Sequence, residues 1–284
     1  MIHIVENEPA EPTRLSDYLK GLFPVLTTNS GIKKAIKRGL IKVNDIASAT
    51  GQYVKQGDVI SYEQEPAPLL DLPMRKIPVI YEDDDIAIVC KPPGLTSSGN
   101  MKTTLANYLP HILRSSTKND RLLVPKLAHR LDKATSGLIV AGKTNEALIK
   151  LGQLHTNQKI IKKYAAIVEG HVPKNLVEFT NAIDGQSAHT VVDAVNWLGT
   201  RDKTSLLYIS LQTGRTHQIR IHLSEAGYPI VGDPIYNADG LSFRKGLFLC
   251  AQQISLPHPI TDEQISLSIE LPAKFQKYTH LRQS

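Results

Sequence analysis

Two short polar segments hold the side chains best suited to chemistry. In residues 129–137 (H-R-L-D-K-A-T-S-G), Asp132 lies among basic and hydroxyl side chains, and an apolar run follows at once. A carboxylate on a loop at a sheet edge, with donors around it, is held ionised and poised for reaction. A structural Asx turn explains this segment alone equally well.

Residues 214–222 (G-R-T-H-Q-I-R-I-H) form a second segment, rich in Arg and His. The presence of both segments in one chain favours a catalytic role for Asp132 over a structural turn. Its two histidines, His217 and His222, are five positions apart on an expected helix and therefore point to different faces. We expect no metal ion to be shared between them.

Residues 137–144 also match the phosphate-binding pattern G-x-x-x-x-G-K-[ST]. That pattern works only as a loop whose backbone N–H groups surround a phosphate after a buried strand. Here Leu, Ile, Val and Ala fill the positions between the glycines, and such residues favour the strand itself. A nucleotide hydrolase is therefore a weaker alternative, which a nucleotide-binding assay would exclude.

The acidic run at 82–85 lies between two apolar runs, as in a hairpin turn. Carboxylates in such a group could be read as a metal site. Four successive residues of a turn cannot all face one ion, so the directions of the side chains favour a solvated turn.

Apolar periodicity predicts the elements that position these segments. We expect helices at 145–155 and 216–226, the latter closed by Gly227. The expected strands are 77–81, 86–90, 137–141, 163–169, 191–197 and 206–213. Because helices and strands mix without strict β-α-β alternation, the expected fold class is α+β around a mixed sheet.

A basic segment precedes these elements. Residues 13–62 hold eight basic and three acidic residues, so they carry +5 of the net charge of +6. Helices are expected at 14–23 and 31–38, followed by short strands at 41–43 and 59–62. On the second helix Lys33, Lys34, Lys37 and Arg38 share one side, with no acid at i+3 or i+4. These four cations favour a phosphate-facing surface over a solvated helix face.

Composition narrows the class of protein. The chain has 284 residues, 41% of them hydrophobic, which suits about two globular domains at roughly 150 residues each. Its two cysteines, Cys90 and Cys250, build neither a disulfide framework nor a four-cysteine zinc site. No secretory signal or membrane-spanning run is visible, so we expect a cytoplasmic protein without a membrane partner.

The motifs together resemble the RluA-type RNA pseudouridine synthases, which isomerise uridine to pseudouridine in RNA. The resemblance runs through residues 77–275, in family order: K-P-P-G-L at 91–95, the segment at 129–137, K-Y at 163–164, T-G-R-T-H-Q-I-R at 213–220, G-D-P-I-Y at 232–236 and H-P at 258–259. Residues 13–62 resemble the small RNA-binding module first seen in ribosomal protein S-four, a common companion in this family.

The resemblance implies an organisation in three parts. The small α/β RNA-binding module occupies 13–62, a proline-containing linker occupies 63–76, and the catalytic domain occupies 77–275. The catalytic domain is expected to hold a mixed, mainly antiparallel sheet around a central cleft.

The resemblance also assigns roles residue by residue. Asp132 matches the catalytic aspartate, which engages the ribose of the target uridine either as a nucleophile or by removing a proton. Arg220 matches the arginine that pairs with this aspartate, and a bidentate pair would orient the carboxylate. Tyr164 matches the tyrosine that stacks on the flipped base and takes part in removing its ring proton. Three further residues would contact the substrate RNA: Arg130 in the space that the uridine vacates, Ile219 against the base, and His129.

No cofactor or metal is implied, and the expected partner is RNA. The N-terminal module favours a uridine of large-subunit (23S) ribosomal RNA over transfer RNA, and we expect a monomer. A catalytically silent RNA-binding protein of the same fold is an alternative that a missing Asp, Arg or Tyr would favour, and all three are present. Two departures from the family pattern are T-S-S-G-N at 96–100, where a His-Pro pair is usual, and Cys250, where His is common.

Overall fold

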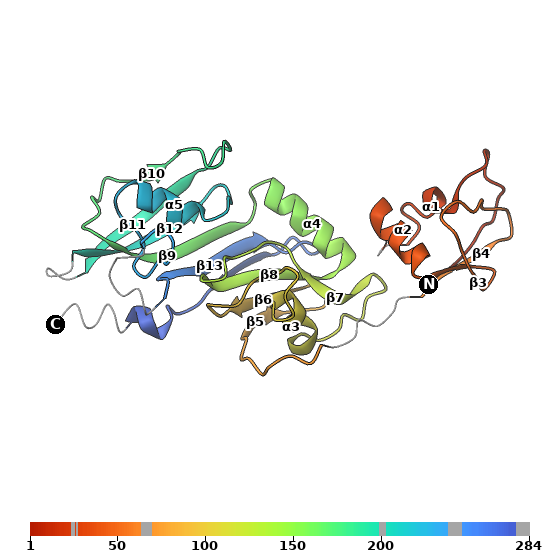
Figure 1. Cartoon of the computed structure of the whole chain (residues 1–284), viewed down its shortest axis with the longest axis horizontal. Coiled ribbons are helices and arrows are strands. Elements are labelled where there is room, and N and C mark those ends of the chain that lie inside the picture. Colours follow the sequence, from red (N-terminus) through yellow and green to blue (C-terminus); the bar gives the residue numbers. More distant parts are fainter. Residues whose placement is uncertain (24–25, 27, 64–69, 199–202, 238–245, 277–284) are drawn as a thin grey trace.

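The chain forms two parts with separate buried cores. The computed structural model describes residues 1–23, 26, 28–63, 70–198, 203–237 and 246–276, so residues 64–69 of the expected linker lie outside the described residues. One core gathers apolar side chains between Val5 and Tyr62, and the others gather those between Ile77 and Phe275. Figure 1 shows the first part in red and the second from yellow to blue. No helix of the described residues is both long and apolar enough to cross a membrane.

The N-terminal part is a four-stranded antiparallel sheet with two helices, α1 (Leu15–Tyr18) and α2 (Asn29–Lys37). The sheet order is β1 (Ile2–Ile4), β4 (Val59–Tyr62), β2 (Ile41–Val43), β3 (Ile46–Ala47). The two expected strands are present as β2 and β4. Strand β1 precedes residue 13, where the sequence predicts the module to begin, yet it pairs with β4 and belongs to this sheet.

The two helices differ from their expected ranges for local reasons. Apolar spacing predicts a helix over 14–23, but α1 ends at Tyr18, and Gly21 then turns the chain at φ +77°. Helix α2 begins two residues earlier than expected because the Thr28 hydroxyl caps it, accepting the N–H of Gly31 at 3.1 Å.

The second part is built on a ten-stranded sheet, mixed and mainly antiparallel as expected. The order is β10, β11, β12, β9, β13, β8, β6, β5, with β14 on β13 and β7 on β8. Among the described strand pairs only β13 and β8 run parallel. The strands are β5 (Val79–Glu82), β6 (Ile86–Lys91), β7 (Arg121–Leu127), β8 (Ser136–Thr144), β9 (Ile161–Glu169), β10 (Glu178–Phe179), β11 (Thr190–Leu198), β12 (Thr204–Leu211), β13 (Leu249–Pro257) and β14 (Gln264–Ser268).

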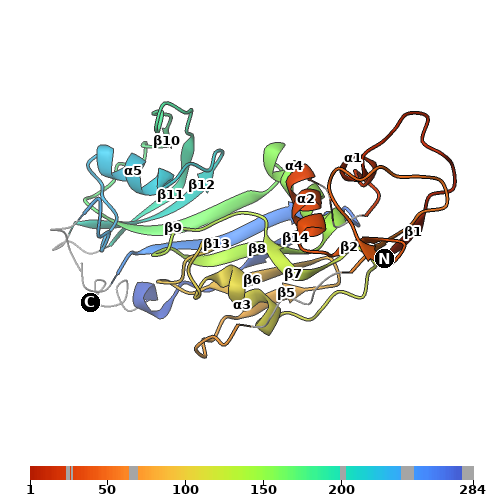
Figure 2. The ribbon, with the colours of Figure 1, turned by 45° about the vertical axis from the view of Figure 1, so that its right-hand side comes forward.

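Among the described residues, helices α3 (Leu105–Ile112), α4 (Asn145–Thr156) and α5 (Gln218–Glu225) accompany this sheet. Helix α4 packs beside β8, and α5 lies beside β11 and β12 (Figures 1 and 2). The strands and helices expected from periodicity are present within a few residues. Helix α3 is not predicted by the sequence because Pro110 lies inside it, near its end.

Strand β8 occupies the residues that match the nucleotide-binding pattern. All nine of its residues are buried, and residues 137–142 pair with β6. The Lys143 ammonium donates to Glu82 at 2.8 Å. Residues 137–144, all of which the structure describes, therefore leave no loop that could surround a phosphate, and the nucleotide hydrolase alternative fails.

Gly137 permits the parallel contact between β8 and β13. Its φ is +119°, and a Cβ built there would lie 2.2 Å from the carbonyl oxygen of Ala251. We expect Gly137→Ala to lower the free energy of unfolding by about 3 kcal/mol or more, because the backbone of a neighbouring strand must shift. Urea unfolding measures this change.

The matched control is Gly152→Ala in α4, where the glycine is exposed and a Cβ would meet nothing within 4 Å. That substitution should raise stability by roughly 0.5–1 kcal/mol, since alanine favours a helix over glycine. A Gly137→Ala variant as stable as the Gly152→Ala variant would show that the close strand contact is not required.

Candidate active site

Asp132 lies in the loop between β7 and β8, which neighbouring groups hold in place. The Ser97 hydroxyl accepts the N–H of Leu131 at 3.0 Å and donates to the carbonyl of the same residue at 2.7 Å. The N–H of Gly94 donates to the Lys133 carbonyl at 2.7 Å. These bonds fix the backbone on both sides of Asp132. Ser97 belongs to the departure at 96–100, so part of that segment supports the aspartate loop.

A buried lysine supports the same loop. Lys91 is 0% exposed, and its ammonium donates to the carbonyls of Leu95 at 2.8 Å, Pro92 at 3.2 Å and Lys133 at 3.3 Å. Burial lowers the pKa of Lys91 to about 8, and the negative charge of Asp132 opposes this change. The three bonds tie the end of β6 to the aspartate loop. Sequence reasoning noted the K-P-P-G-L segment but assigned no role to its lysine, which is seldom a fully buried residue type.

Arg220 lies in the first turn of α5, beside Asp132, but its principal partner is another carboxylate. Its Nη1 lies 3.4 Å from Oδ2 of Asp132. Its Nε and Nη2 donate to the two oxygens of Asp233 at 2.7 and 2.8 Å. The expected contact with Asp132 therefore exists as one longer bond, and the bidentate pair that would orient Asp132 is formed with Asp233 instead. A guanidinium allows this because its five N–H groups serve two carboxylates at once.

Asp233 fixes the charge and position of Arg220. Burial alone would raise the pKa of Asp233 and lower that of Arg220. Their mutual hydrogen bonds reverse both changes, helped by the N–H groups of Ile235 and Tyr236, which donate to Asp233. The pKa of Asp233 is thus lowered and that of Arg220 raised. A charged guanidinium in a fixed position faces Asp132 as a result.

His217 and Tyr236 complete this side of the site. His217 adopts φ +58° immediately before α5, and its Nε2 lies 3.8 Å from Oδ2 of Asp132. Its Nδ1 lies 3.1 Å from the Tyr236 hydroxyl, and the Arg220 guanidinium lies 5.1 Å from the centre of the Tyr236 ring. Sequence reasoning missed both roles, although His217 and Tyr236 lie in the motifs at 213–220 and 232–236.

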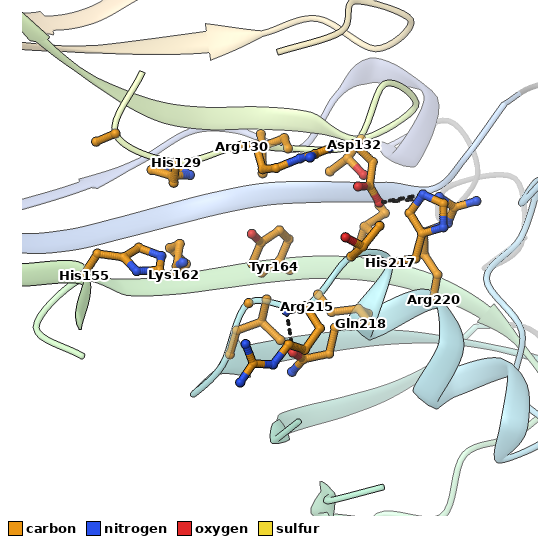
Figure 3. Close-up of a pocket in the computed structure, with 18 residues that line it drawn as sticks. His129, Arg130, Asp132, His155, Lys162, Tyr164, Arg215, His217, Gln218 and Arg220 are labelled. Atoms are coloured by element: carbon orange, nitrogen blue, oxygen red, sulfur yellow. Dashed lines mark hydrogen bonds and ion pairs between the residues drawn. The ribbon is translucent and has the colours of Figure 1, made fainter. Parts of the chain in front are cut away.

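A cavity of about 290 Å³ opens between these groups and the centre of the sheet. Tyr164 of β9 lines it, with Asp132 and Arg220 at one end, as Figure 3 shows. Ile219, 3% exposed, lines the same cavity. Burial raises the pKa of the Tyr164 phenol, and the negative charge of Asp132 raises it further. The phenol is therefore neutral at neutral pH.

The structure gathers six of the ten expected site residues in this one cavity: Asp132, Arg220, Tyr164, Arg130, His129 and Ile219. Arg130 is exposed, whereas the Nε2 atom of His129 accepts the N–H of Val140 at 3.2 Å. The remaining four, Lys33, Lys34, Lys37 and Arg38, are exposed on and just after α2 in the other part of the chain. They do not line this cavity.

The two histidines of the second polar segment face different partners, as their spacing predicts. His222 is buried, with Nδ1 2.9 Å from the Thr190 hydroxyl and Nε2 2.9 Å from the Asn181 carbonyl. His217 instead faces Asp132. These contacts leave no common ligand position for the two imidazoles.

The acidic run at 82–85 forms the turn between β5 and β6, but it is not the solvated turn that the sequence predicts. Asp85 is 7% exposed, and its oxygens accept from Lys118 at 2.7 and 2.8 Å. Asp83 accepts two backbone N–H groups, and His258 lies 2.9 Å from it. Asp83, Asp85 and His258 are close enough to one another for a metal site. Protein donors already satisfy their oxygens, so we assign no metal here.

Known proteins that are similar in sequence to this chain include RNA pseudouridine synthases. A family model described as RNA pseudouridylate synthase matches residues 85–225. An uncharacterized RNA pseudouridine synthase of Aquifex aeolicus is 33% identical, and the alignment covers 94% of this chain and 92% of that protein. Ribosomal large subunit pseudouridine synthase C of Rickettsia felis is 32% identical, with 93% and 94% covered.

A solved structure shares the fold. Human RNA pseudouridylate synthase domain containing 4 superposes with a TM-score of 0.56 at 24% identity, covering 72% of this chain and 92% of that one. The matched family region contains Asp132, Tyr164 and Arg220, which the structure gathers in one cavity. The chain belongs to the RluA-type RNA pseudouridine synthases, isomerases that convert uridine in RNA to pseudouridine.

Proposed function

We propose that this chain converts uridine of large-subunit ribosomal RNA to pseudouridine in the cavity formed by Asp132, Tyr164 and Arg220. The observation that carries the proposal is the convergence of these three side chains on one cavity of about 290 Å³. Relatives named for the ribosomal large subunit support this RNA as the substrate. In the reaction the bond from ribose C1′ to N1 breaks, the base turns, and C1′ bonds to C5. The proton leaves C5 and N1 gains one, so the atoms balance without an oxidant or reductant.

Asp132 is the group that we assign to the ribose. Its side chain is 18% exposed, and two basic side chains lie within 4 Å of its Oδ2, Arg220 at 3.4 Å and His217 at 3.8 Å. Attack on the sugar and removal of a ribose proton both require the charged carboxylate. The neighbouring guanidinium of Arg220 contacts this carboxylate and holds it in one orientation. We therefore assign Arg220 as a positioning residue that acts through Asp132.

Tyr164 and Ile219 supply surfaces for the flipped base. An aromatic ring offers a stacking face to any nucleobase, and the isoleucine offers apolar contact. Because burial keeps the Tyr164 phenol neutral, we propose stacking as its main role rather than transfer of the C5 proton. Exposed Arg130 is placed to enter the space that the uridine leaves in the RNA.

We propose that the N-terminal part binds RNA as a module of the ribosomal-protein S-four type. Its four exposed cations, Lys33, Lys34, Lys37 and Arg38, lie on and just after α2. The segment 13–62 carries most of the net charge of the chain. A concentrated positive surface separate from the cavity suits the RNA backbone, which is a polyanion.

Replacing these four cations by Gln should weaken RNA binding at moderate salt and leave the chemical step unchanged. Each lost phosphate contact lowers the slope of log affinity against log salt by roughly 0.7–0.9, so four should flatten it by about three units. Titration of RNA binding at several salt concentrations measures the slope, and single-turnover kinetics at saturating enzyme measure the chemical step.

The control changes Lys20 and Lys42 to Gln, because these lysines already pair with Asp17 and Glu63 within the protein. This double variant should keep the parental slope. A folded quadruple variant with an unaltered slope would show that the α2 cations form a solvated helix face and that the module has another role.

Mapping pseudouridine in a strain that lacks this gene tests the substrate. We expect a site to be lost from large-subunit ribosomal RNA and restored by the intact chain. Loss from transfer RNA alone would replace the proposed substrate by transfer RNA. A strain that loses no pseudouridine in either RNA would favour the catalytically silent alternative.

A further inference from the structure

The cavity extends past Tyr164 to basic side chains that the proposed chemistry does not use. Lys162, His155 and His129 lie at the end opposite Asp132 and Arg220, as Figure 3 shows. Since Lys162 and Tyr164 are two residues apart on β9 and line the same cavity, about 7 Å separates their backbone positions. If a base is held at Tyr164, the part of the RNA chain adjacent to that base therefore reaches this end of the cavity.

A second hollow, of about 240 Å³, begins at two of these side chains, Lys162 and His155. His155, Lys162, Leu211 and Gly214 line both spaces, and the second hollow continues between the start of β9 and the end of β12. The two hollows therefore adjoin at Lys162, where an RNA strand held at Tyr164 could pass from one to the other. A single small ligand bound at Asp132 would not need this path.

The basic side chains lack an acidic partner. Among the residues that the structure describes, the ammonium of Lys162 makes no hydrogen bond or ion pair. Burial lowers its pKa, with no opposing effect from a carboxylate. Burial and the charge of Lys162 also lower the pKa of His155, and that of His129 falls to about 3. The cluster thus holds one partly buried cation beside two neutral imidazoles, with no counter-charge from the described residues.

His129 lines the cavity as a neutral ring whose Nδ1 atom is buried. Because its Nε2 accepts the N–H of Val140, the hydrogen of the neutral ring lies on Nδ1. The backbone of Arg130 lies near this ring and raises its pKa, but by less than burial lowers it. Nδ1 makes no hydrogen bond of normal geometry with the described residues. Because Nδ1 is itself buried, it is not open to a ligand in the cavity.

We propose that Lys162 binds the backbone phosphate adjacent to the target uridine, at the end of the cavity that His155 and His129 line, and that the next nucleotide occupies the second hollow. Lys162 supplies the positive charge, and the neutral rings of His155 and His129 line the space beside it without adding a negative charge. Phosphate fits the cluster better than a base because the uncompensated charge calls for an anion. This inference deepens the proposed function and rests on RNA being the substrate.

The test measures binding of the full chain to fluorescent dodecauridylate, with either phosphodiester or uncharged methylphosphonate linkages. We expect Lys162→Gln to weaken binding of the phosphodiester strand about tenfold, the effect of one lost charge-assisted hydrogen bond. Binding of the methylphosphonate strand should change less than about twofold, since it offers no charge to lose. Lys162→Arg should retain parental binding of the phosphodiester strand because it keeps the positive charge.

Lys163→Gln is the matched control, because it removes the same charge from the next residue of β9, which does not line either hollow. The inference is overturned if Lys162→Gln and Lys163→Gln bind the phosphodiester strand with equal affinity. It is also overturned if Lys162→Gln weakens binding of the phosphodiester and methylphosphonate strands by the same factor. The binding measurement needs no turnover. Failure of the proposed function would appear separately, as unchanged pseudouridine in the strain that lacks the gene.

Discussion

Asp132→Asn is expected to reduce pseudouridine formation by roughly 10⁴-fold or more while the protein stays folded and binds RNA. The amide keeps the shape of the carboxylate and still accepts from Nη1 of Arg220, which lies 3.4 Å from Oδ2 in the parent. It can neither attack the ribose nor remove its proton, because it carries no negative charge. Single-turnover kinetics at saturating enzyme measure the effect on the chemical step.

Asp71→Asn is the matched control, since it makes the same chemical change at an exposed residue outside the cavity. It should react at the parental rate. Turnover by Asp132→Asn at more than a trace of that rate would show that Asp132 is not a catalytic residue. The thermal unfolding midpoint of the variant would show whether it has also lost its fold.

Arg220→Lys should lower the rate of the chemical step by about 10²–10³-fold and leave RNA affinity nearly unchanged. Arg220 makes two bonds to Asp233 and a third contact to Asp132 from one rigid plane. A lysine keeps the charge but cannot reproduce this geometry, so the charge near Asp132 loses its fixed position. The ratio of the single-turnover rates, with binding measured separately, tests this expectation.

Arg114→Lys provides the comparison, because Arg114 is an exposed arginine whose side chain pairs with Glu82 away from the cavity. That substitution should have no effect on the rate. If Arg220→Lys reacts as fast as Arg114→Lys, the position of the guanidinium plane does not matter to the reaction, and the assignment of Arg220 as a positioning residue is wrong.

Much of the fold could be predicted because the relevant signals are local. Alternating or continuous apolar runs gave β6, β8 and β9, and the apolar pattern followed by Gly227 gave α5. The same reasoning showed that residues 137–144 form a strand rather than a phosphate loop. Strand β1 was missed because three residues are too few to show a period, and its pairing partner β4 lies more than fifty positions away in the sequence.

The composition of the site was predictable from motifs, but its pairing was not. The motifs identified Asp132, Tyr164 and Arg220 as site residues without any knowledge of geometry. The structure then brings all three to one cavity. The motifs did not show that Asp233 takes the bidentate contact of Arg220, since thirteen positions and a turn separate the two residues. The burial of Asp85 beside Lys118 was missed for the same reason, because this ion pair joins residues 33 positions apart.

The basic end of the cavity was also beyond sequence reasoning. Lys162 and Lys163 are adjacent lysines with the same local signal, and only the pleat of β9 directs the first into the cavity with Tyr164. His155 reaches the same place from the last turn of α4. A cluster drawn from a helix end, a strand and a loop has no spacing that a single sequence reveals.

Release of tritium from large-subunit ribosomal RNA tests the central claim most directly. The RNA is transcribed with uridine tritiated at C5 and incubated with the intact chain or with Asp132→Asn. Because C5 exchanges its hydrogen for the bond to ribose, we expect the intact chain to release tritium into water in proportion to the pseudouridine formed, and the variant to release none. Absence of release by the intact chain, or equal release by the two proteins, would contradict pseudouridine formation at Asp132.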